Sequence, residues 1–212
     1  MLIGLTGTYC SGKNYVAALL EKRGLPVLDV DKLGYQTLEA EKESIFAQFG
    51  PDLKRADGSL DRRLLGKRTF GKPEKLASLE AIVHPTVNRL TDEWIAAREK
   101  AGDGVFVINA ALLHKSTVFN RLDRIILVTA PFFTRLLRAK QRDKLSLLEI
   151  MRRFSSQKGF KTQYLTVNAN PFYAEIHIVE NPGIFGSGSL YHKHNVCKKL
   201  ESRIDKCLEG IR

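Results

Sequence analysis

One short stretch near the N-terminus restricts the fold of this chain more than any other. Residues 7–14 read GTYCSGKN, which matches the phosphate-binding pattern G-x-x-x-x-G-K, except that Asn14 stands where Ser or Thr normally follows the lysine. The apolar run at 2–6 predicts a buried strand, and the apolar spacing after Gly12 predicts a helix that Gly24 ends. Strand, loop and helix in this order predict an α/β fold that binds nucleotide phosphates at the loop.

The residues of this stretch have separate expected roles. Gly7 and Gly12 allow backbone angles that turn successive N–H groups inward around phosphate oxygens. Lys13 reaches the β- and γ-phosphates, and the helix after it presents its positive N-terminal end. Asn14 carries an amide oxygen on a longer stem than a Ser hydroxyl, so we expect it to hold Mg²⁺ through a water. The competing interpretation is a glycine-rich turn that binds no ligand.

Further apolar runs predict the remaining strands. They cover residues 25–30, 105–110, 124–129 and 175–180. Continuous apolar strands that alternate with helices are typical of a parallel sheet covered on both faces. The sequence therefore predicts a five-stranded parallel sheet flanked by helices, of the P-loop nucleotide hydrolase type, in one domain over 1–212. Residues 194–211 carry an apolar side chain every four positions and predict a closing amphipathic helix.

Two segments interrupt the alternation of strands and helices. In the first, residues 32–103, Asp57 and Gly58 predict a turn, and Ser59 predicts the cap of a helix. A second helix begins at Lys72-Pro73 and ends near His84, where Pro85 opens a third. This segment is therefore a helical insertion. The second excursion, at 135–161, predicts a helical hairpin.

Basic residues gather in that second excursion. The chain carries 34 Lys and Arg against 23 Asp and Glu, a net charge of +11. Nine of the basic residues lie between Arg135 and Lys161, where Asp143 and Glu149 are the acidic residues that oppose them. Aromatic side chains do not alternate with them as on a base-stacking surface. We therefore expect small-molecule phosphates as partners and no nucleic acid.

Composition excludes other classes of protein. No apolar run approaches the roughly 20 residues that a membrane helix needs, and the N-terminus lacks the basic and apolar regions of a signal peptide. Three scattered cysteines argue against a disulfide framework and for a reducing compartment. We expect a cytoplasmic protein, with an oligomeric state that the sequence leaves open.

Two pairs of charged residues have the chemistry of phosphoryl transfer. Asp29 and Asp31 fall at the carboxyl end of the second predicted strand, where a carboxylate can orient an acceptor hydroxyl and take its proton. The alternative is that Asp31 caps the following helix. Arg138 and Arg142 are four residues apart on one helix face and suit the charge on a transferring phosphate. The alternative for them is a solvated basic face.

In their order and spacing, these motifs resemble those of dephospho-coenzyme A (dephospho-CoA) kinase, a family of P-loop kinases. The resemblance extends over nearly the whole chain, although the loop is its one specific motif. It includes LTGTYCSGK at 5–13, GLPVLDVD at 24–31, DGSLDRRLL at 57–65, HP at 84–85, LL at 112–113, QRD at 141–143, Gln157 and VENPG at 179–183.

The resemblance implies ATP- and Mg²⁺-dependent phosphorylation of the ribose 3′-hydroxyl of dephospho-CoA. It implies a nucleotide core (about 1–31, 104–131 and 169–212), an acceptor-binding insertion (about 32–103) and a lid (about 132–168). The implied catalytic residues are Lys13, Asp31, Arg138 and Arg142. The implied nucleotide contacts are Gly7, Tyr9, Cys10, Ser11, Gly12, Lys13, Asn14 and Tyr15 in the loop and Asn181, Pro182 and Gly183 in an adenine-contacting turn. The implied acceptor contacts are Asp31, His84, Leu112 and Leu113.

The chain departs from the family pattern at several places. Asn14 replaces Ser or Thr, and Tyr35 stands where arginine is usual. The segment from Ala111 to Lys115 replaces the usual PLL-x-E, and the lysine reverses a local charge. These departures concern metal handling and acceptor placement. Two other functions stay open: a different small-molecule P-loop kinase, such as a nucleoside or nucleotide kinase, and a nucleotide- or nucleic-acid-binding protein that no longer catalyses.

Overall fold

The computed structural model describes residues 1–143, 145–167, 174–182 and 190–210. Contacts within the chain divide it into two compact units. The first unit comprises Met1–Leu28 and Asp103–Arg212, and the second comprises Asp29–Gly102. The segment predicted as a lid belongs to the first unit. Its separate movement, like the division into core, insertion and lid, stays a prediction.

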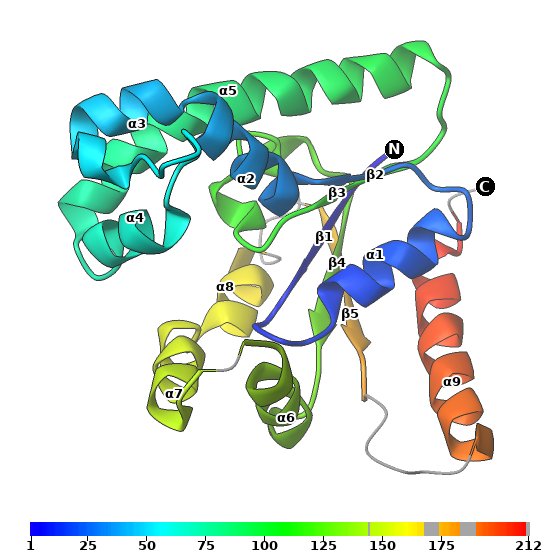
Figure 1. Cartoon of the computed structure of the whole chain (residues 1–212). Helices are drawn as coiled ribbons and strands as arrows, with labels where there is room; N and C mark the ends of the chain where they lie inside the picture. Colours follow the sequence, from blue (N-terminus) through cyan, green and yellow to red (C-terminus); the bar gives the residue numbers. More distant parts are fainter. Residues whose placement is uncertain (144, 168–173, 183–189, 211–212) are drawn as a thin grey trace. The chain divides into compact units, whose positions relative to one another are not determined.

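A five-stranded parallel sheet forms the centre of the first unit, which confirms the predicted fold class (Figure 1). The strand order is β2-β3-β1-β4-β5, so the loop-bearing strand β1 lies in the middle with a parallel neighbour on each side. The strands are β1 (Leu2–Gly7), β2 (Val27–Asp29), β3 (Phe106–Asn109), β4 (Arg124–Thr129) and β5 (Glu175–Glu180). The second strand is shorter than the predicted 25–30, because Val30 already begins the next helix.

The side chains of β1 alternate between two covered faces. Ile3 and Leu5 are fully buried in a cluster with residues of α1 (Lys13–Glu21) and α9 (Leu190–Leu208), which lie together beside the sheet in Figure 1. On the other face, a Cβ on Gly4 would lie 2.5 Å from Leu113 and 2.8 Å from Leu122. Glycine at this position therefore lets the short helices η2 (Leu113–Lys115) and η3 (Phe119–Arg121) approach the sheet closely.

The second excursion consists of three helices instead of the predicted hairpin. They are α6 (Phe132–Asp143), α7 (Leu147–Ser156) and α8 (Phe160–Val167). A capping box begins α7: Ser146 Oγ accepts from the backbone N–H of Glu149, whose carboxylate accepts from the Ser146 N–H at 3.0 Å. A turn with Gly159 at φ +83° separates α7 from α8, and this break accounts for the third helix.

The second unit is helical, and its longest helix differs from the sequence-based prediction. Its elements are α2 (Val30–Ala40), α3 (Lys42–Phe49), η1 (Pro51–Leu53), α4 (Arg62–Thr69) and α5 (Pro73–Lys100). The predicted break at Pro85 is wrong, because α5 runs through it. Buried side chains continue on both sides of the proline at Val83, Val87, Thr91 and Ile95. Packing of this stripe outweighs the one backbone hydrogen bond that proline removes.

The start of α4 also differs from the prediction. The turn at Asp57-Gly58 is confirmed, with Gly58 at φ +80°. Ser59 takes part in that turn, since its hydroxyl donates to Asp57 at 2.6 Å. Asp61 is the actual cap of α4 and accepts from the Leu64 N–H at 2.9 Å. No helix in the described part of the chain is long and apolar enough to cross a membrane.

Candidate nucleotide-binding site

The loop after β1 turns through two residues with left-handed backbone angles. Gly12 has φ +90° and ψ +29°, and Cys10 has φ +59°. The prediction that Gly7 supplies a similar angle is wrong, because Gly7 is the last residue of β1 and is not among the residues with positive φ. Glycine is required at this position for steric reasons, since a Cβ there would lie 2.6 Å from Ser11 Oγ and 2.7 Å from the Val128 carbonyl oxygen.

Backbone contacts hold the loop in a compact turn. The Ser11 N–H donates to the Thr8 carbonyl at 2.9 Å, and the Thr8 N–H donates to Val128 of β4 at 3.2 Å. Lys13 is the first residue of α1, and the N–H groups of Tyr15 and Val16 both donate to the Gly12 carbonyl, at 3.0 and 3.2 Å. The positive end of the helix dipole therefore lies at the loop. The loop therefore places an electropositive helix end and Lys13 beside each other, as a phosphate site requires.

Asn14 has a partner that the sequence did not indicate. Asn109, the last residue of β3, donates from Nδ2 to Asn14 Oδ1 at 3.4 Å. The side-chain oxygens of Thr8, Ser11 and Asn109 are buried and have no hydrogen-bond partner among the described residues. These atoms all lie in or beside the loop, and a bound ligand would give them partners.

Asn181, which directly follows β5, stabilises the loop through hydrogen bonds of its side chain. Its side chain is only 4% exposed, and its Nδ2 donates to the Ser11 carbonyl at 2.9 Å. Its own N–H donates to Thr129 of β4 at 2.7 Å. The Pro182 carbonyl accepts from the Thr134 hydroxyl at 3.2 Å. The asparagine side chain therefore supports the loop, while Gly183, the third member of the predicted adenine turn, lies outside the described residues.

The two predicted arginines of α6 lie at the loop but make different contacts. Arg138 donates from Nη1 to the Ser11 carbonyl at 3.0 Å and from Nη2 to Asn181 Oδ1 at 3.3 Å. Arg142 forms a pair with Asp143, whose hydrogen bonds raise the pKa of the Arg142 guanidinium. Burial lowers the pKa of Arg138, although a guanidinium stays charged at any physiological pH.

A cavity lies where these elements meet. It measures about 380 Å³ and is lined by Cys10, Gly12, Arg138, Gln141 and Arg142. A larger cavity of about 620 Å³, beside Arg23 and the end of α9, contains none of the predicted site residues. Chemistry favours the smaller one, because it combines loop backbone with two guanidinium groups.

A third basic residue, Arg135, belongs to the same arrangement and was not predicted. Its Nε donates to the Tyr9 carbonyl at 2.8 Å, and its guanidinium lies 4.6 Å from the centre of the Phe154 ring. The sequence did contain a signal for this role, because Arg135 lies seven residues, or two helical turns, before Arg142. The sequence therefore showed the face of α6 that meets the loop but not how far it extends.

The predicted acceptor residues are divided between the two units. Asp31 lies in the first turn of α2, and His84 lies within α5 of the same unit. The interpretation of Asp31 as a helix cap is wrong, because Asp29 caps α2 and accepts from the Lys32 N–H at 3.0 Å. In the other unit, Leu112 is 49% exposed and open to a ligand, whereas the side chain of Leu113 is 0% exposed and packs in the core.

The departures from the family pattern have structural partners. The guanidinium of Arg62 lies 5.6 Å from the centre of the Tyr35 ring. His114 contacts the buried Tyr164 hydroxyl through both its backbone N–H and its Nδ1, each at 3.1 Å. Burial lowers the pKa of His114. The changed segment, which follows β3, therefore packs against aromatic side chains of α8.

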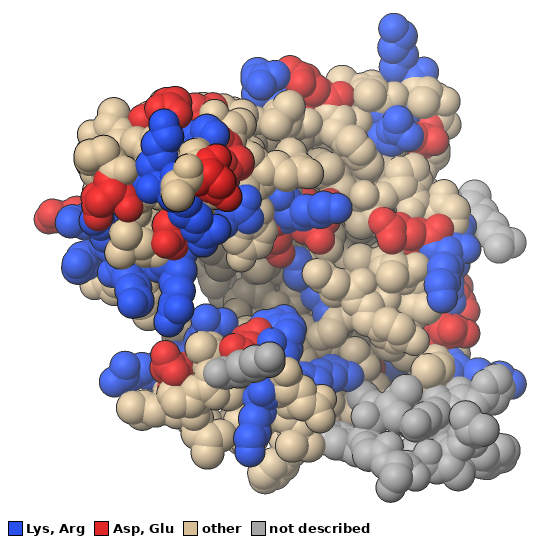
Figure 2. Space-filling model, viewed as in Figure 1, with Lys and Arg blue, Asp and Glu red and all other residues tan. Residues whose placement is uncertain are grey.

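Acidic residues accompany the basic ones on one face of the molecule and within the basic segment. On the face in Figure 2, Asp and Glu side chains lie among the Lys and Arg side chains. Within the basic segment itself, Asp143 pairs with Arg142 at 2.6 Å and with Arg153 at 3.2 Å. Asp143 therefore offsets part of the positive charge of this segment.

Comparisons with known proteins agree with one another. A model of the family described as dephospho-CoA kinase matches residues 1–168. The dephospho-CoA kinase of Treponema pallidum is 35% identical over 178 residues, which cover 81% of this chain and 84% of that protein. A dephospho-CoA kinase domain-containing protein of Danio rerio is 31% identical over 214 residues, with coverages of 99% and 88%.

Solved structures share the fold. A crystal structure of a Thermus thermophilus protein matches with a TM-score of 0.77 and 32% identity, over 98% of this chain and 95% of that chain. A dephospho-CoA kinase from Campylobacter jejuni matches with a TM-score of 0.62 and 21% identity, over 99% and 98%. The second likeness bears on the fold alone.

Proposed function

The chain belongs to the dephospho-CoA kinase family and phosphorylates dephospho-CoA to CoA with ATP, and we propose that the loop, Asp31 and the α6 arginines divide this reaction among them. The observation that carries the proposal is the loop between β1 and α1, with Gly12 at φ +90° and Arg138 held against its carbonyls. This is a phosphate cradle with a cation fixed beside it.

The proposed reaction is an in-line transfer of the γ-phosphoryl group. The bond between the acceptor 3′-oxygen and the γ-phosphorus forms while the bridging oxygen leaves with ADP. Asp31 orients the hydroxyl and takes its proton. Lys13 and the first turn of α1 hold the β- and γ-phosphates, while Arg142 neutralises charge from the α6 side of the cavity.

Arg138 has a structural role at the loop and a proposed role in the reaction. Its contacts with the loop carbonyls and Asn181 fix the guanidinium before any ligand binds. Such preorganisation supports a role in stabilising the transferring phosphate, since an ordered cation needs no rearrangement during the reaction. Asn181 is then a support for the loop in addition to its proposed place near the adenine.

Mg²⁺ is the metal that this chemistry would use. The described residues hold no group of three or more His, Cys, Asp or Glu side chains that could bind a metal. The amide oxygens of Asn14 and Asn109 are hard oxygen donors of the kind that Mg²⁺ accepts, and that of Asn109 is buried without a partner among the described residues. These residues fit an ion carried by the nucleotide phosphates and waters, with Asn14 as its protein contact, direct or through water. The ion would supply charge neutralisation on the phosphates.

We propose a cytoplasmic location from the cysteines. Cys10, Cys197 and Cys207 are all free thiols, and two of them are buried. Thiols that stay unpaired suit a reducing compartment. Small-molecule phosphates remain the expected partners, without nucleic acid, and the oligomeric state is left to measurement.

The test is a coupled assay of ADP release with dephospho-CoA present and absent, beside a panel of nucleosides and nucleotides. We expect ATP consumption only with dephospho-CoA, and a loss of about 100-fold or more in kcat for Lys13→Ala. Lys198→Ala, at an exposed lysine of α9, is the matched control and should keep wild-type turnover. Turnover of Lys13→Ala within about threefold of wild type would contradict the assignment of the loop.

A further inference from the structure

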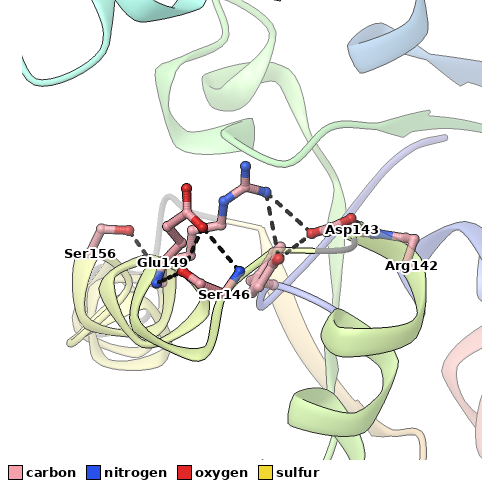
Figure 3. A network of polar contacts seen from close by, with 7 residues as sticks. Arg142, Asp143, Ser146, Glu149 and Ser156 are labelled. Atoms are coloured by element: carbon pink, nitrogen blue, oxygen red, sulfur yellow. Dashed lines mark hydrogen bonds and ion pairs between the residues drawn. The ribbon is translucent and has the colours of Figure 1, made fainter.

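The last residue of α6, Asp143, collects donors from three parts of the chain (Figure 3). Arg142 donates to it from Nε at 2.6 Å and from Nη2 at 3.1 Å, and Arg153 of α7 donates from Nη1 at 3.2 Å. The Tyr9 hydroxyl donates to the same carboxylate. The side chain of Asp143 is only 15% exposed, whereas those of Arg142 and Arg153 are 61% and 46% exposed, so the carboxylate is covered while both guanidinium groups stay in contact with water.

Tyr9 is a residue of the phosphate loop, and the α6–α7 segment holds it at several points. Two cations lie over its ring, with the guanidinium carbon of Arg142 at 5.4 Å and that of Arg153 at 5.5 Å from the ring centre. Its N–H donates to Gln157 Oε1 at 2.6 Å, and its carbonyl accepts from Arg135. Tyr9 therefore links the loop to both α6 and α7 in one network.

The contacts leave part of Arg142 available to a ligand. A guanidinium has five N–H groups, and Asp143 uses one on Nε and one on Nη2. Nη1 and the other N–H of Nη2 remain, and Arg142 lines the cavity beside Cys10 and Gly12. Two arginines face one carboxylate, so a net positive charge stays at the loop. Asp143 thus orients Arg142 without neutralising it.

We propose that Asp143 and Tyr9 are positioning residues that hold Arg142 in register with the phosphate loop for ATP. The proposal rests on the proposed function, because it concerns the arginine assigned there to the phosphates. Without the carboxylate, the long side chain of Arg142 would adopt many rotamers and would have to be ordered when ATP binds. The ion pair raises the pKa of Arg142 and lowers that of Asp143, which agrees with a tight pair.

The test is a double-mutant cycle between Asp143 and Arg142, with two readouts. Calorimetric titration gives the Kd for ATP, and ADP release gives kcat and KM. Asp143→Asn should weaken ATP binding about tenfold, and Tyr9→Phe, which keeps the ring and removes the hydroxyl, about threefold. Combined with Arg142→Ala, either change should have almost no further effect, because the group that it positions is gone.

Glu149→Ala is the matched control for a merely structural effect in the same segment. It breaks the capping box of α7 without touching Arg142. Its effect on ATP affinity should therefore add to that of Arg142→Ala. If Asp143→Asn fails to fold, as judged by circular dichroism, the Tyr9→Phe cycle supplies the same comparison.

The outcomes separate this inference from the proposed function. Additive effects of Asp143→Asn or Tyr9→Phe with Arg142→Ala, or wild-type affinity in both single variants, overturn the positioning role while the kinase assignment stands. Wild-type affinity and turnover in Arg142→Ala overturn it together with the phosphate role of that arginine. If the protein binds ATP but does not phosphorylate dephospho-CoA, the calorimetric cycle still decides the positioning role.

Discussion

Replacing Gly12 by alanine tests how the loop is held. The substitution has two unfavourable effects, one from the backbone angle at Gly12 and one from a steric clash with Asn181. Gly12 has φ +90°, and a left-handed backbone costs a residue with a Cβ about 1–2 kcal/mol. The new Cβ would also lie 2.3 Å from Asn181 Nδ2 and 3.4 Å from Arg138 Nη1, so the asparagine must move.

The displacement of Asn181 sets the larger part of the effect. Its Nδ2 would leave the Ser11 carbonyl, and the contact of its Oδ1 with Arg138 would weaken. Buried hydrogen bonds of this kind contribute about 1 kcal/mol each, and a buried group left unsatisfied costs about 1–3 kcal/mol. Gly12→Ala should therefore lower the free energy of unfolding by about 3–4 kcal/mol in all.

Gly24→Ala is the matched control. Gly24 has φ +80°, and nothing lies within 4 Å of a Cβ built there. This variant should lose about 1–2 kcal/mol, from the backbone angle alone. Urea unfolding of both variants gives the difference, and thermal unfolding should show about 2–4 °C per kcal/mol in a chain of this size.

ATP affinity supplies the second readout of the same pair. Gly24→Ala should bind ATP as wild type does, whereas Gly12→Ala should bind it weakly, because the loop carbonyls and Arg138 lose their fixed positions. Adding Asn181→Ala to Gly12→Ala should cause little further loss of stability, since the clash and the contacts vanish together. Equal destabilisation of Gly12→Ala and Gly24→Ala would refute the reasoning.

Three further predictions concern single residues. Asp31→Asn should lower kcat by about 10²-fold or more with little change in the Kd for ATP, and a folded variant with full activity would show that Asp31 is only a residue of the first turn of α2. Asn14→Ser should lower the Mg²⁺ concentration for half-maximal activity at saturating ATP and acceptor, and an equal or higher requirement would show that Asn14 is already an adapted ligand. Burial raises the pKa of Cys207 to about 11, so stability should be complete below the unfolded thiol pKa of about 8.5 and fall as the pH rises toward 11. Urea unfolding at these pH values should show that Cys207→Ala lacks this part of the fall, and a parallel fall in the variant would assign it to other groups.

The sequence was sufficient for the elements whose signal is local. The runs at 124–129 and 175–180 became β4 and β5 with the same bounds, because both are rich in Ile and Val. β4 is a buried strand, whereas Val179 is the buried residue of β5, which lies at the edge of the sheet. The loop and the start of α1 were equally clear, since glycines and a lysine at fixed spacing are a local pattern. In α9, Leu200 and Ile204 are buried as their spacing predicted.

The sequence-based predictions were wrong where the structure depends on packing between residues that are far apart in the sequence. Pro85 is a local signal for a helix end, yet the buried stripe of α5 continues past it. Gly7 fits the loop pattern, but the requirement for glycine comes from Val128 on another strand. The roles of Tyr9 and Asn181 depend on partners 134 and 170 residues away. No spacing within the motif could have shown these pairs.

Asn14 departs from the usual loop pattern, and its side chain has a hydrogen-bond partner on another strand of the sheet. β1 and β3 are parallel neighbours, so the loop after β1 and Asn109 at the end of β3 meet at the same edge of the sheet. Asn109 donates to Asn14 Oδ1 at 3.4 Å, and an amide oxygen has a second lone pair for a water or a cation. A Ser hydroxyl oxygen lies one bond nearer the backbone than the Asn Oδ1, so Asn14→Ser would leave the Asn109 amide without this acceptor. The two asparagines therefore form a pair, and exchanging Asn14 for the usual residue changes the surroundings of a buried side chain as well as the metal contact.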